Sequence, residues 1–244
     1  MKAIEINDLR KEYKDIVAVN NLNLEIEEGE LFSLLGVNGA GKTTTIKMLA
    51  TLLKPTSGKA SIEGYDILKD ADKVKEIVDI SMQETAIARK LTVEENINFY
   101  GKLSGLSDEE LKEGKEELYK DFGLDAVKKK RADKLSGGWQ RKLSIALALI
   151  SKPRILFLDE PTLGLDVIAR RELWKTISAL KKKMTIILTT HYMEEAEALS
   201  DRIGIMKDGN LLFVGTKEEL YQVSNKTNVE EAFISIVTGG DLNA

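Results

Sequence analysis

One short segment constrains this chain more than any other, a glycine-rich loop between a strand pattern and a helix pattern. Residues 36–44 read Gly-Val-Asn-Gly-Ala-Gly-Lys-Thr-Thr, after an apolar run at 31–35 and before a helical pattern at 46–50. Glycines let backbone N–H groups turn towards an anion, and the positive end of the helix dipole adds to the attraction. Strand, loop and helix in this order are typical of a nucleotide site, whereas an ordinary glycine-rich turn needs neither flank.

The loop offers two kinds of contact to a nucleotide. Its backbone can cradle the phosphates, while the Lys42 ammonium can reach the β- and γ-phosphates and the Thr43 hydroxyl can ligate Mg²⁺. The sequence therefore predicts a site for a nucleotide with Mg²⁺. The candidate nucleotide-binding residues of the loop are Gly36, Val37, Asn38, Gly39, Ala40, Gly41, Lys42, Thr43 and Thr44.

Charge and composition exclude several other classes of protein. The 244 residues carry 36 Lys and Arg against 40 Asp and Glu, a net charge of −4, so we expect no nucleic acid partner. The absence of cysteine excludes disulfides and thiolate metal sites and is consistent with a reducing cytoplasm. No apolar stretch is long enough to cross a bilayer, and the first residues do not resemble a signal peptide, so we expect any membrane role to come through a partner chain.

Hydrophobic periodicity divides the chain into regions of different character. Apolar and polar residues alternate through 2–35, which indicates antiparallel strands with a turn at 28–30. Helical patterns dominate 85–152, and capping-box spacing occurs twice, at Thr92 with Glu95 and at Ser107 with Glu110. After Pro153, apolar strands alternate with helices, which favours a mostly parallel sheet buried on both faces. We expect further strands at 59–62, 78–82, 155–158, 185–188 and 203–206, a hairpin around 208–209, and helices at 42–53, 93–103, 108–122, 138–150, 166–182, 192–199, 217–223 and 228–237. Pro55 is expected to help end the first of these helices.

Two carboxylates, Asp159 and Glu160, follow the expected strand at 155–158. Carboxylates at the tip of a buried strand are costly unless a cation or hydrogen bonds stabilise them. A nucleotide with Mg²⁺ would supply that cation. Asp159 would then hold the metal, directly or through water, and Glu160 would orient and deprotonate the attacking water. A capping pair before the turn at 161–162 is the alternative.

A second candidate for anion binding lies at 135–141, which reads Leu-Ser-Gly-Gly-Trp-Gln-Arg. Ser136, Gly137 and Gly138 open an expected helix, and the N–H groups at a helix N-terminus attract anions. Read alone, the segment is equally well explained as a helix cap, and both interpretations stay open at this point.

Taken together and in order, these segments resemble the nucleotide-binding subunit of ATP-binding-cassette (ABC) transporters over residues 1–216. The resemblance rests on several motifs in the correct order and spacing. The matching segments are 36–44 for the Walker A loop, Gln83 for the Q-loop, 135–139 for the signature motif, 156–160 for Walker B, 163–166 for the D-loop and His191 for the switch histidine.

The resemblance implies ATP and Mg²⁺ as cofactors and a role for each matching residue. Tyr13 would stack on adenine, with a half-buried tyrosine at a strand edge as the alternative. Gln83 would touch Mg²⁺ or water and couple to the membrane partner; read alone it is a polar residue at a strand end. His191, the only histidine, would contact the γ-phosphate. The implied catalytic residues are Glu160, His191 and Lys42, and the implied metal contacts are Thr43, Gln83 and Asp159.

The signature segment departs from the family at Trp139, where the family has glutamine. Ser136, Gly137 and Gly138, which in the family meet the γ-phosphate, are all present, so we expect activity to be retained. The phosphate loop and the signature occur once each. Because the signature of one subunit covers the nucleotide of the other in this family, the resemblance implies a head-to-tail dimer, most simply a homodimer, with two ATP in its interface.

The implied fold is α/β, that of a P-loop ABC ATPase with a RecA-like mixed sheet core, an N-terminal antiparallel β-subdomain and an inserted helical subdomain. We expect an ABC ATPase domain at 1–216, with a catalytic lobe at 1–84 and 153–216 and a helical lobe at 85–152. A helical tail would follow at 217–244.

The implied function is hydrolysis of ATP to ADP and phosphate, coupled to transport through a separately encoded transmembrane permease. Residues 191–197 and 229–233 resemble the ATPases of ABC-2-type exporters of drugs, sodium, polysaccharides or lipids. We therefore expect export, with the chain peripheral on the cytoplasmic face of the cell membrane, and importers stay open as an alternative.

Two rival functions follow from the same motifs. A soluble ABC ATPase acting on nucleic acid or ribosomes would show a long coiled-coil insertion or two cassettes in one chain, and neither pattern occurs here. A binding module that senses nucleotide without turnover would not need Glu160 and His191, and both are present.

Overall fold

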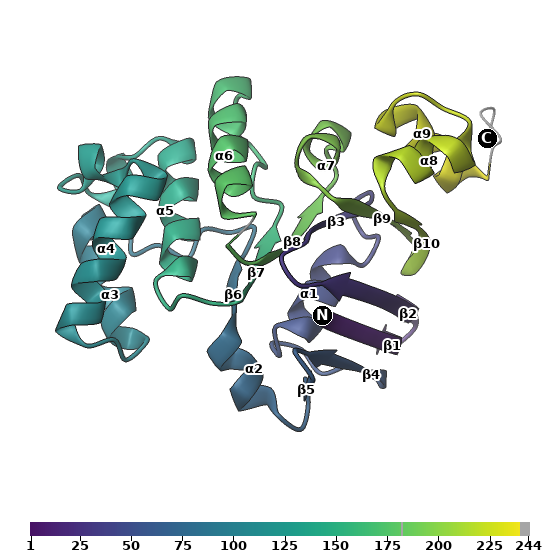
Figure 1. Cartoon of the computed structure of the whole chain (residues 1–244), viewed down its shortest axis with the longest axis horizontal. Coiled ribbons are helices and arrows are strands. Elements are labelled where there is room, and N and C mark those ends of the chain that lie inside the picture. Colours follow the sequence, from purple (N-terminus) through teal and green to yellow (C-terminus); the bar gives the residue numbers. More distant parts are fainter. Residues whose placement is uncertain (182, 240–244) are drawn as a thin grey trace.

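Two β-sheets and a group of helices make up the fold in the computed structural model, which describes residues 1–181 and 183–239 (Figure 1). The strands are β1 (Lys2–Tyr13), β2 (Ile16–Glu27), β3 (Leu31–Leu35), β4 (Ser57–Ile62), β5 (Tyr65–Asp66), β6 (Val78–Ser81), β7 (Ile155–Asp159), β8 (Thr185–Thr190), β9 (Arg202–Lys207) and β10 (Asn210–Gly215). The α-helices are α1 (Lys42–Leu49), α2 (Ala71–Ile77), α3 (Val93–Leu103), α4 (Asp108–Phe122), α5 (Gly137–Leu149), α6 (Val167–Leu180), α7 (Met193–Leu199), α8 (Lys217–Ser224) and α9 (Val229–Thr238). Two 3₁₀ turns, η1 (Leu124–Val127) and η2 (Ala132–Lys134), connect α4 to α5.

The two sheets differ in strand direction. The four-stranded sheet, in the order β2-β1-β4-β5, is antiparallel. The six-stranded sheet, in the order β10-β9-β3-β8-β7-β6, is parallel except for β10, which pairs antiparallel with β9 at one edge. The predicted α/β class, with a mixed sheet, an N-terminal antiparallel sheet and an inserted group of helices, is confirmed.

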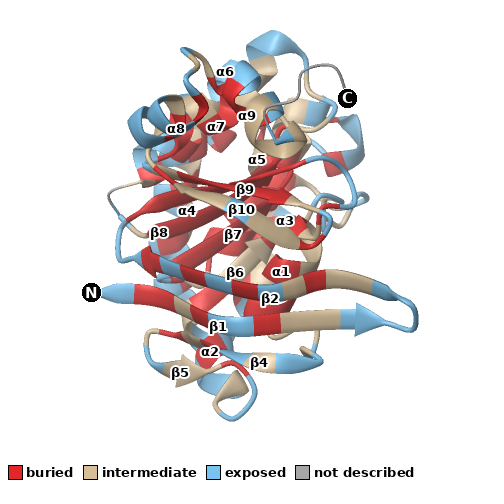
Figure 2. Ribbon diagram, turned by 90° about the vertical axis from the view of Figure 1, so that its right-hand side faces the viewer, coloured by how far each residue is buried: buried red, intermediate tan, exposed pale blue. Residues whose placement is uncertain are grey.

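Side chains of β7 alternate between two hydrophobic cores. Leu156 and Leu158 join a core built with α3, α4, α5 and α6, whereas Ile155 and Phe157 join a core built with β1, β2 and α1. All residues of β3, β7 and β8 are buried, which is why Figure 2 shows the middle of the larger sheet in red. A central parallel strand covered on both faces reads as a continuous apolar run, as the sequence predicted.

Local signals set the starts of two helices in the inserted group. Thr92 Oγ1 accepts from Glu95 N at 3.2 Å, and the Glu95 carboxylate accepts from Thr92 N at 2.8 Å. Ser107 and Glu110 repeat both bonds at 3.2 and 2.8 Å. Both predicted capping boxes are therefore confirmed, and they fix the first turns of α3 and α4.

The predicted helix at 42–53 is wrong at its end, because α1 stops at Leu49. Thr51 has a left-handed φ of +60°, and the N–H groups of Leu52 and Leu53 donate to Lys47 O at 2.8 and 3.0 Å. A left-handed residue with such back-bonding ends a helix and reverses the chain. The helix therefore ends and the chain turns before it reaches Pro55.

Other elements differ less from the prediction or were missed. The short β5 and α2 were not predicted. The predicted helix at 166–182 corresponds to α6, and residue 182 lies outside the described residues. The predicted division into lobes at 84/85 and 152/153 stays a prediction.

Helices α8 and α9 confirm the two helices predicted for the tail. Residues 240–244 of the predicted tail lie outside the described residues. Helices α8 and α9 pack on α7 and β9 through a third core that includes Leu35, Ile205, Leu220 and Phe233. None of the described helices is both long and apolar enough to span a membrane.

Candidate functional site

The glycine-rich loop leaves the carboxyl end of β3 and leads directly into α1. Gly41 has a φ of +105°, and a Cβ there would lie 2.3 Å from the carbonyl oxygen of Ala18. A Cβ on Gly36 would lie 2.3 Å from the carbonyl oxygen of Met206. Glycine is therefore required at both positions for the loop to curl against β2 and β9 with α1 starting behind it.

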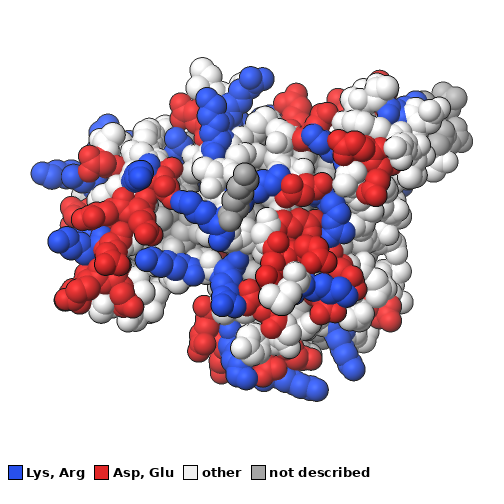
Figure 3. Space-filling model, in the orientation of Figure 1, with Lys and Arg blue, Asp and Glu red and all other residues white. Residues whose placement is uncertain are grey.

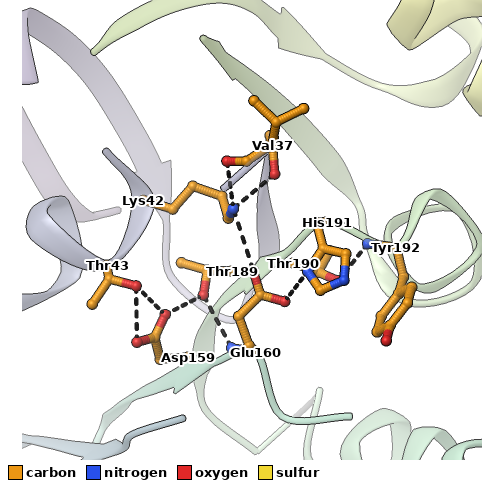
Figure 4. A network of polar contacts seen from close by, with 10 residues as sticks. Val37, Lys42, Thr43, Asp159, Glu160, Thr189, Thr190, His191 and Tyr192 are labelled. Atoms are coloured by element: carbon orange, nitrogen blue, oxygen red, sulfur yellow. Dashed lines mark hydrogen bonds and ion pairs between the residues drawn. The ribbon is translucent and has the colours of Figure 1, made fainter. Parts of the chain in front are cut away.

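Lys42 is the first residue of α1, and its side chain is 5% exposed. Its ammonium donates to the carbonyl oxygens of Gly36 at 2.7 Å and Val37 at 3.2 Å. It also lies 3.2 Å from Glu160 Oε1 (Figure 4). The loop backbone and one carboxylate thus hold this cation over the loop.

Asp159 ends β7 and is fully buried. Its oxygens accept from Thr43 Oγ1 at 2.9 and 3.0 Å and from Thr189 Oγ1 at 2.6 Å. A carboxylate and a hydroxyl are hard oxygen ligands of the kind that Mg²⁺ takes, so these residues fit the metal. Among the described residues no group of three or more acidic, histidine or cysteine side chains could hold a metal ion, so a Mg²⁺ here would need phosphate oxygens and water as further ligands.

Glu160 follows β7 in a left-handed conformation with φ of +48°. Its N–H is held by Thr189, at 3.1 Å from both the carbonyl and the hydroxyl oxygen. Its carboxylate bridges two groups, Lys42 through Oε1 and His191 Nδ1 through Oε2 at 2.7 Å (Figure 4). Strained backbone of this kind collects at functional sites, where surrounding contacts over-determine it.

A cavity of about 480 Å³ brings most of the predicted phosphate-binding residues together. A neighbouring hollow of about 560 Å³ shares Thr43 and Gln83 with it and also reaches Asp159. Gly36 and Val37 contribute carbonyl groups to Lys42 instead of lining the cavity. The described residues that line the cavity are Ala18, Asn38, Gly39, Ala40, Gly41, Lys42, Thr43, Thr44, Gln83, Glu160, Leu163 and His191.

The signature segment lies apart from this cavity. Ser136 is the exposed N-cap of α5, and its side chain accepts no capping hydrogen bond. Gly137 and Gly138 form the first turn of that helix. Neither they nor Ser136 belong to the described residues that line the cavity. Trp139 packs against the helical core, with the Lys142 ammonium 4.9 Å from its ring centroid.

Comparison with known proteins identifies the group to which the chain belongs. The profile of the family described as "ABC transporter" matches residues 19–163, which include the loop and both carboxylates. The chain belongs to the ABC transporter family. ABC transporter A family member 4 of Arabidopsis thaliana is 46% identical over 206 residues, which are 84% of this chain but only 22% of the plant protein.

Two further comparisons extend the result. Phospholipid-transporting ATPase ABCA3 of Homo sapiens is 44% identical over 223 residues, 90% of this chain and 13% of that protein. A solved dimeric, post-hydrolysis state of the ATP-binding cassette MJ0796, bound to ADP and Pi, matches with a TM-score of 0.77 and 28% identity, over 87% of this chain and 98% of that chain. The fold and the assignment as an ATP-binding domain of an ABC transporter are confirmed. Because the relatives carry A-family names, the ABC-2-type subgroup stays a prediction.

In this ABC ATPase domain, Tyr13 lies at the end of β1 and is 45% exposed. It pairs with Ile16 across the β1–β2 turn, and the Lys11 ammonium lies 4.9 Å from its ring centroid. Tyr13 is not in the described lining of the cavity, whereas Ala18 on the same hairpin is. Its role as the adenine-stacking residue stays a prediction.

We expect Tyr13→Ala to weaken ATP binding by about 1 kcal/mol, roughly fivefold in Kd, the size of one aromatic stack. Tyr13→Trp should restore the affinity. Ile16→Ala removes an exposed apolar side chain from the same turn and should leave the affinity unchanged. Calorimetric titration of each variant with ATP measures the effect, and a parental Kd for Tyr13→Ala would place the adenine against other residues.

Sequence reasoning missed two side chains that support the site. Thr189 contacts Asp159 and Glu160 from the neighbouring strand, and only its place two residues before His191 marked it. Arg141, 5% exposed on α5, donates to the carbonyl oxygens of Met82, at 2.7 Å, and Gln83. Burial lowers the pKa of this guanidinium, against the charges of Asp159 and Glu195. Arg141 thereby joins the helix of the signature segment to the backbone of the Q-loop.

Proposed function

We propose that this domain binds ATP with Mg²⁺ and hydrolyses it to ADP and phosphate, and that this cycle drives transport through a membrane permease. The observation that carries the proposal is the position of the Glu160 carboxylate, bridged to Lys42 and His191 beside the cavity. A carboxylate with a phosphate-binding lysine on one side and a histidine on the other has the arrangement needed to orient and deprotonate water.

Each residue of the site takes a separate role in this proposal. Lys42 and the backbone of the loop bind the β- and γ-phosphates, and Thr43 with Asp159 would hold Mg²⁺, which supplies positive charge to the phosphates. Glu160 accepts the proton of the attacking water, and His191 contacts the γ-phosphate. Gln83, exposed between the two hollows, is placed to touch the metal or its water.

A head-to-tail homodimer completes the proposed site. Ser136, Gly137 and Gly138 form an exposed helix N-terminus, away from the cavity of their own chain, that suits an anion held by a second copy. The similar cassette MJ0796 was solved as a dimer with ADP and Pi, which supports a dimer here.

For the permease, we propose a separate membrane chain, with this domain on the cytoplasmic face of the membrane and transport in the direction of export. The lengths of the A-family relatives favour a second candidate, a permease continuous with this domain in a longer polypeptide. Because one relative is named for phospholipid transport, phospholipids are the first substrates to test. The size of the native polypeptide in cell membranes distinguishes the candidates, since a chain several times longer than 244 residues, like those of the A-family relatives, would favour the continuous permease.

The purified domain tests the enzymatic part. We expect the domain to release phosphate from ATP, and we expect this release to stop when EDTA removes the metal. ATP binding without phosphate release would favour the alternative of a binding module that senses nucleotide without turnover. Stimulation by RNA or ribosomes would favour the alternative of a soluble ABC ATPase that acts on them. The charge distribution does not favour this alternative, because Figure 3 shows acidic side chains gathered over the antiparallel sheet and mixed with basic ones elsewhere on that face.

We expect Lys42→Ala to weaken ATP binding by roughly 10- to 100-fold, because it removes a charge-assisted hydrogen bond to the phosphates. Lys54→Ala, which removes an exposed lysine just beyond α1, should keep the parental affinity. Calorimetric titration gives the Kd, and a thermal melt establishes that both variants are folded. An unchanged Kd for Lys42→Ala would exclude the loop as the phosphate site.

A further inference from the structure

The residue after His191 holds its aromatic ring against the imidazole. The ring centroids of His191 and Tyr192 are 4.2 Å apart, with an angle of 41° between the planes (Figure 4). A third side chain extends the stack, since the guanidinium carbon of Arg170 lies 4.4 Å from the Tyr192 ring centroid. Arg170 belongs to α6 and Tyr192 directly precedes α7, so the stack joins the two helices.

The backbone of Tyr192 is fixed at the same place. Its N–H donates to Thr190 Oγ1 at 3.0 Å, and its carbonyl oxygen accepts from Glu195 N at 3.1 Å. One turn further along α6, Trp174 Nε1 donates to Glu195 Oε1 at 3.0 Å. Because residues four apart share a face of a helix, Arg170 and Trp174 act together in packing α6 against the start of α7.

Arg170 is held by the ring more than by hydrogen bonds. Its Nε is buried and has no hydrogen-bond partner within the part of the chain that the structure describes. A planar guanidinium stacks well on an aromatic face, and an arginine used in this way is not replaceable by lysine.

These contacts close a path that begins and ends at Glu160. From Glu160 the chain runs through a turn, in which Leu163 N donates to Glu160 O at 3.2 Å, into α6. On α6, the Arg170 guanidinium stacks on the Tyr192 ring, and this ring packs on the His191 imidazole. His191 Nδ1 in turn lies 2.7 Å from Glu160 Oε2. The imidazole is 28% exposed, and its hydrogen bond within the described residues is the one to Glu160, so the stack supplies a second contact that holds its orientation.

We propose that Tyr192, held by Arg170, is a positioning residue that keeps the His191 imidazole on Glu160 in the orientation needed for turnover. The effect on turnover rests on the proposed function, whereas the placement of the imidazole does not. The two parts are therefore tested separately.

The placement is tested by NMR, because the chain contains a single histidine and its imidazole carbon-bound protons give one unambiguous pair of signals. The ring current of Tyr192 should displace these signals in the parent protein. Tyr192→Leu should remove the displacement, and Tyr192→Phe should restore it. Arg170→Met should shift the signals, whereas Arg171→Met, its exposed neighbour on α6, should not. Signals that are the same in the parent, Tyr192→Leu and Arg170→Met would overturn the proposal.

The effect on turnover is tested with a double-mutant cycle. We expect Tyr192→Leu to lower kcat by roughly 3- to 10-fold with little change in KM, the size of one lost aromatic contact, and Tyr192→Phe to recover most of it. In a His191→Ala background, Tyr192→Leu should cause no further loss. An equal loss in both backgrounds would mean that Tyr192 acts without His191. No turnover in the parent protein would refute the proposed function and leave the NMR result to decide the placement.

Discussion

Glu160→Gln is expected to remove most ATP turnover, by roughly 10²- to 10⁴-fold, while ATP still binds. Glutamine has nearly the same shape and can still contact Lys42 and His191, but it cannot accept a proton from water. The phosphate-binding loop and the pair of Thr43 and Asp159 stay intact, so binding should persist. With hydrolysis blocked, the ATP-bound dimer should accumulate.

Steady-state phosphate release and an ATP titration, made on the same sample, measure the two effects. Glu194→Gln is the matched control, because this exposed glutamate lies three residues from His191 on α7. It should keep the parental turnover. If Glu160→Gln hydrolyses ATP at close to the parental rate, another group is the base.

Ser136→Arg is expected to abolish ATP-driven dimerisation and to leave ATP binding by the monomer unchanged. Ser136 is exposed at the start of α5 and does not line the cavity of its own chain. In the proposed dimer it faces the γ-phosphate held by the other copy, where a long side chain would obstruct closure.

Size-exclusion chromatography with ATP, in the Glu160→Gln background, gives the test. Ser104→Arg introduces the same side chain at the exposed end of α3, also among the inserted helices, and should dimerise normally. A dimer that survives Ser136→Arg would mean that this segment does not cover the nucleotide of the partner, and the head-to-tail arrangement would have to be abandoned.

Features that depend on neighbours in sequence could be predicted, and contacts between distant segments could not. The loop around Lys42, the carboxylates after β7 and both capping boxes each follow from a few consecutive residues. The bond from Thr189 to Asp159 depends on β8 lying beside β7, and the bond from Arg141 to Met82 joins residues 59 apart. Hydrophobic periodicity identifies strands and helices but does not give strand order, so neither bond was accessible.

The incorrect end of α1 has a local cause of a different kind. Proline is the usual sign of a helix end, so Pro55 was expected to act as the stop. The chain instead reverses at Thr51, which has a left-handed conformation. Because this conformation is unusual for a β-branched residue, the sequence gives no local sign of the turn. The stacking of Arg170 on Tyr192 was missed for the same reason as the distant bonds, because it depends on how α6 packs against α7.

Because Lys42 is paired with Glu160, nucleotide binding in the proposed cycle exchanges one anionic partner of the lysine, the carboxylate, for another, the phosphate. Both side chains are almost fully buried, and a buried charge that loses its partner costs about 3–5 kcal/mol. In the proposed cycle, an arriving γ-phosphate competes with the carboxylate for the lysine, and the carboxylate can return when phosphate leaves. The affinity for ATP thus depends on a competition between the γ-phosphate and the Glu160 carboxylate for the Lys42 ammonium group. After each turnover, Glu160 is the anion that pairs with Lys42 again and restores neutrality.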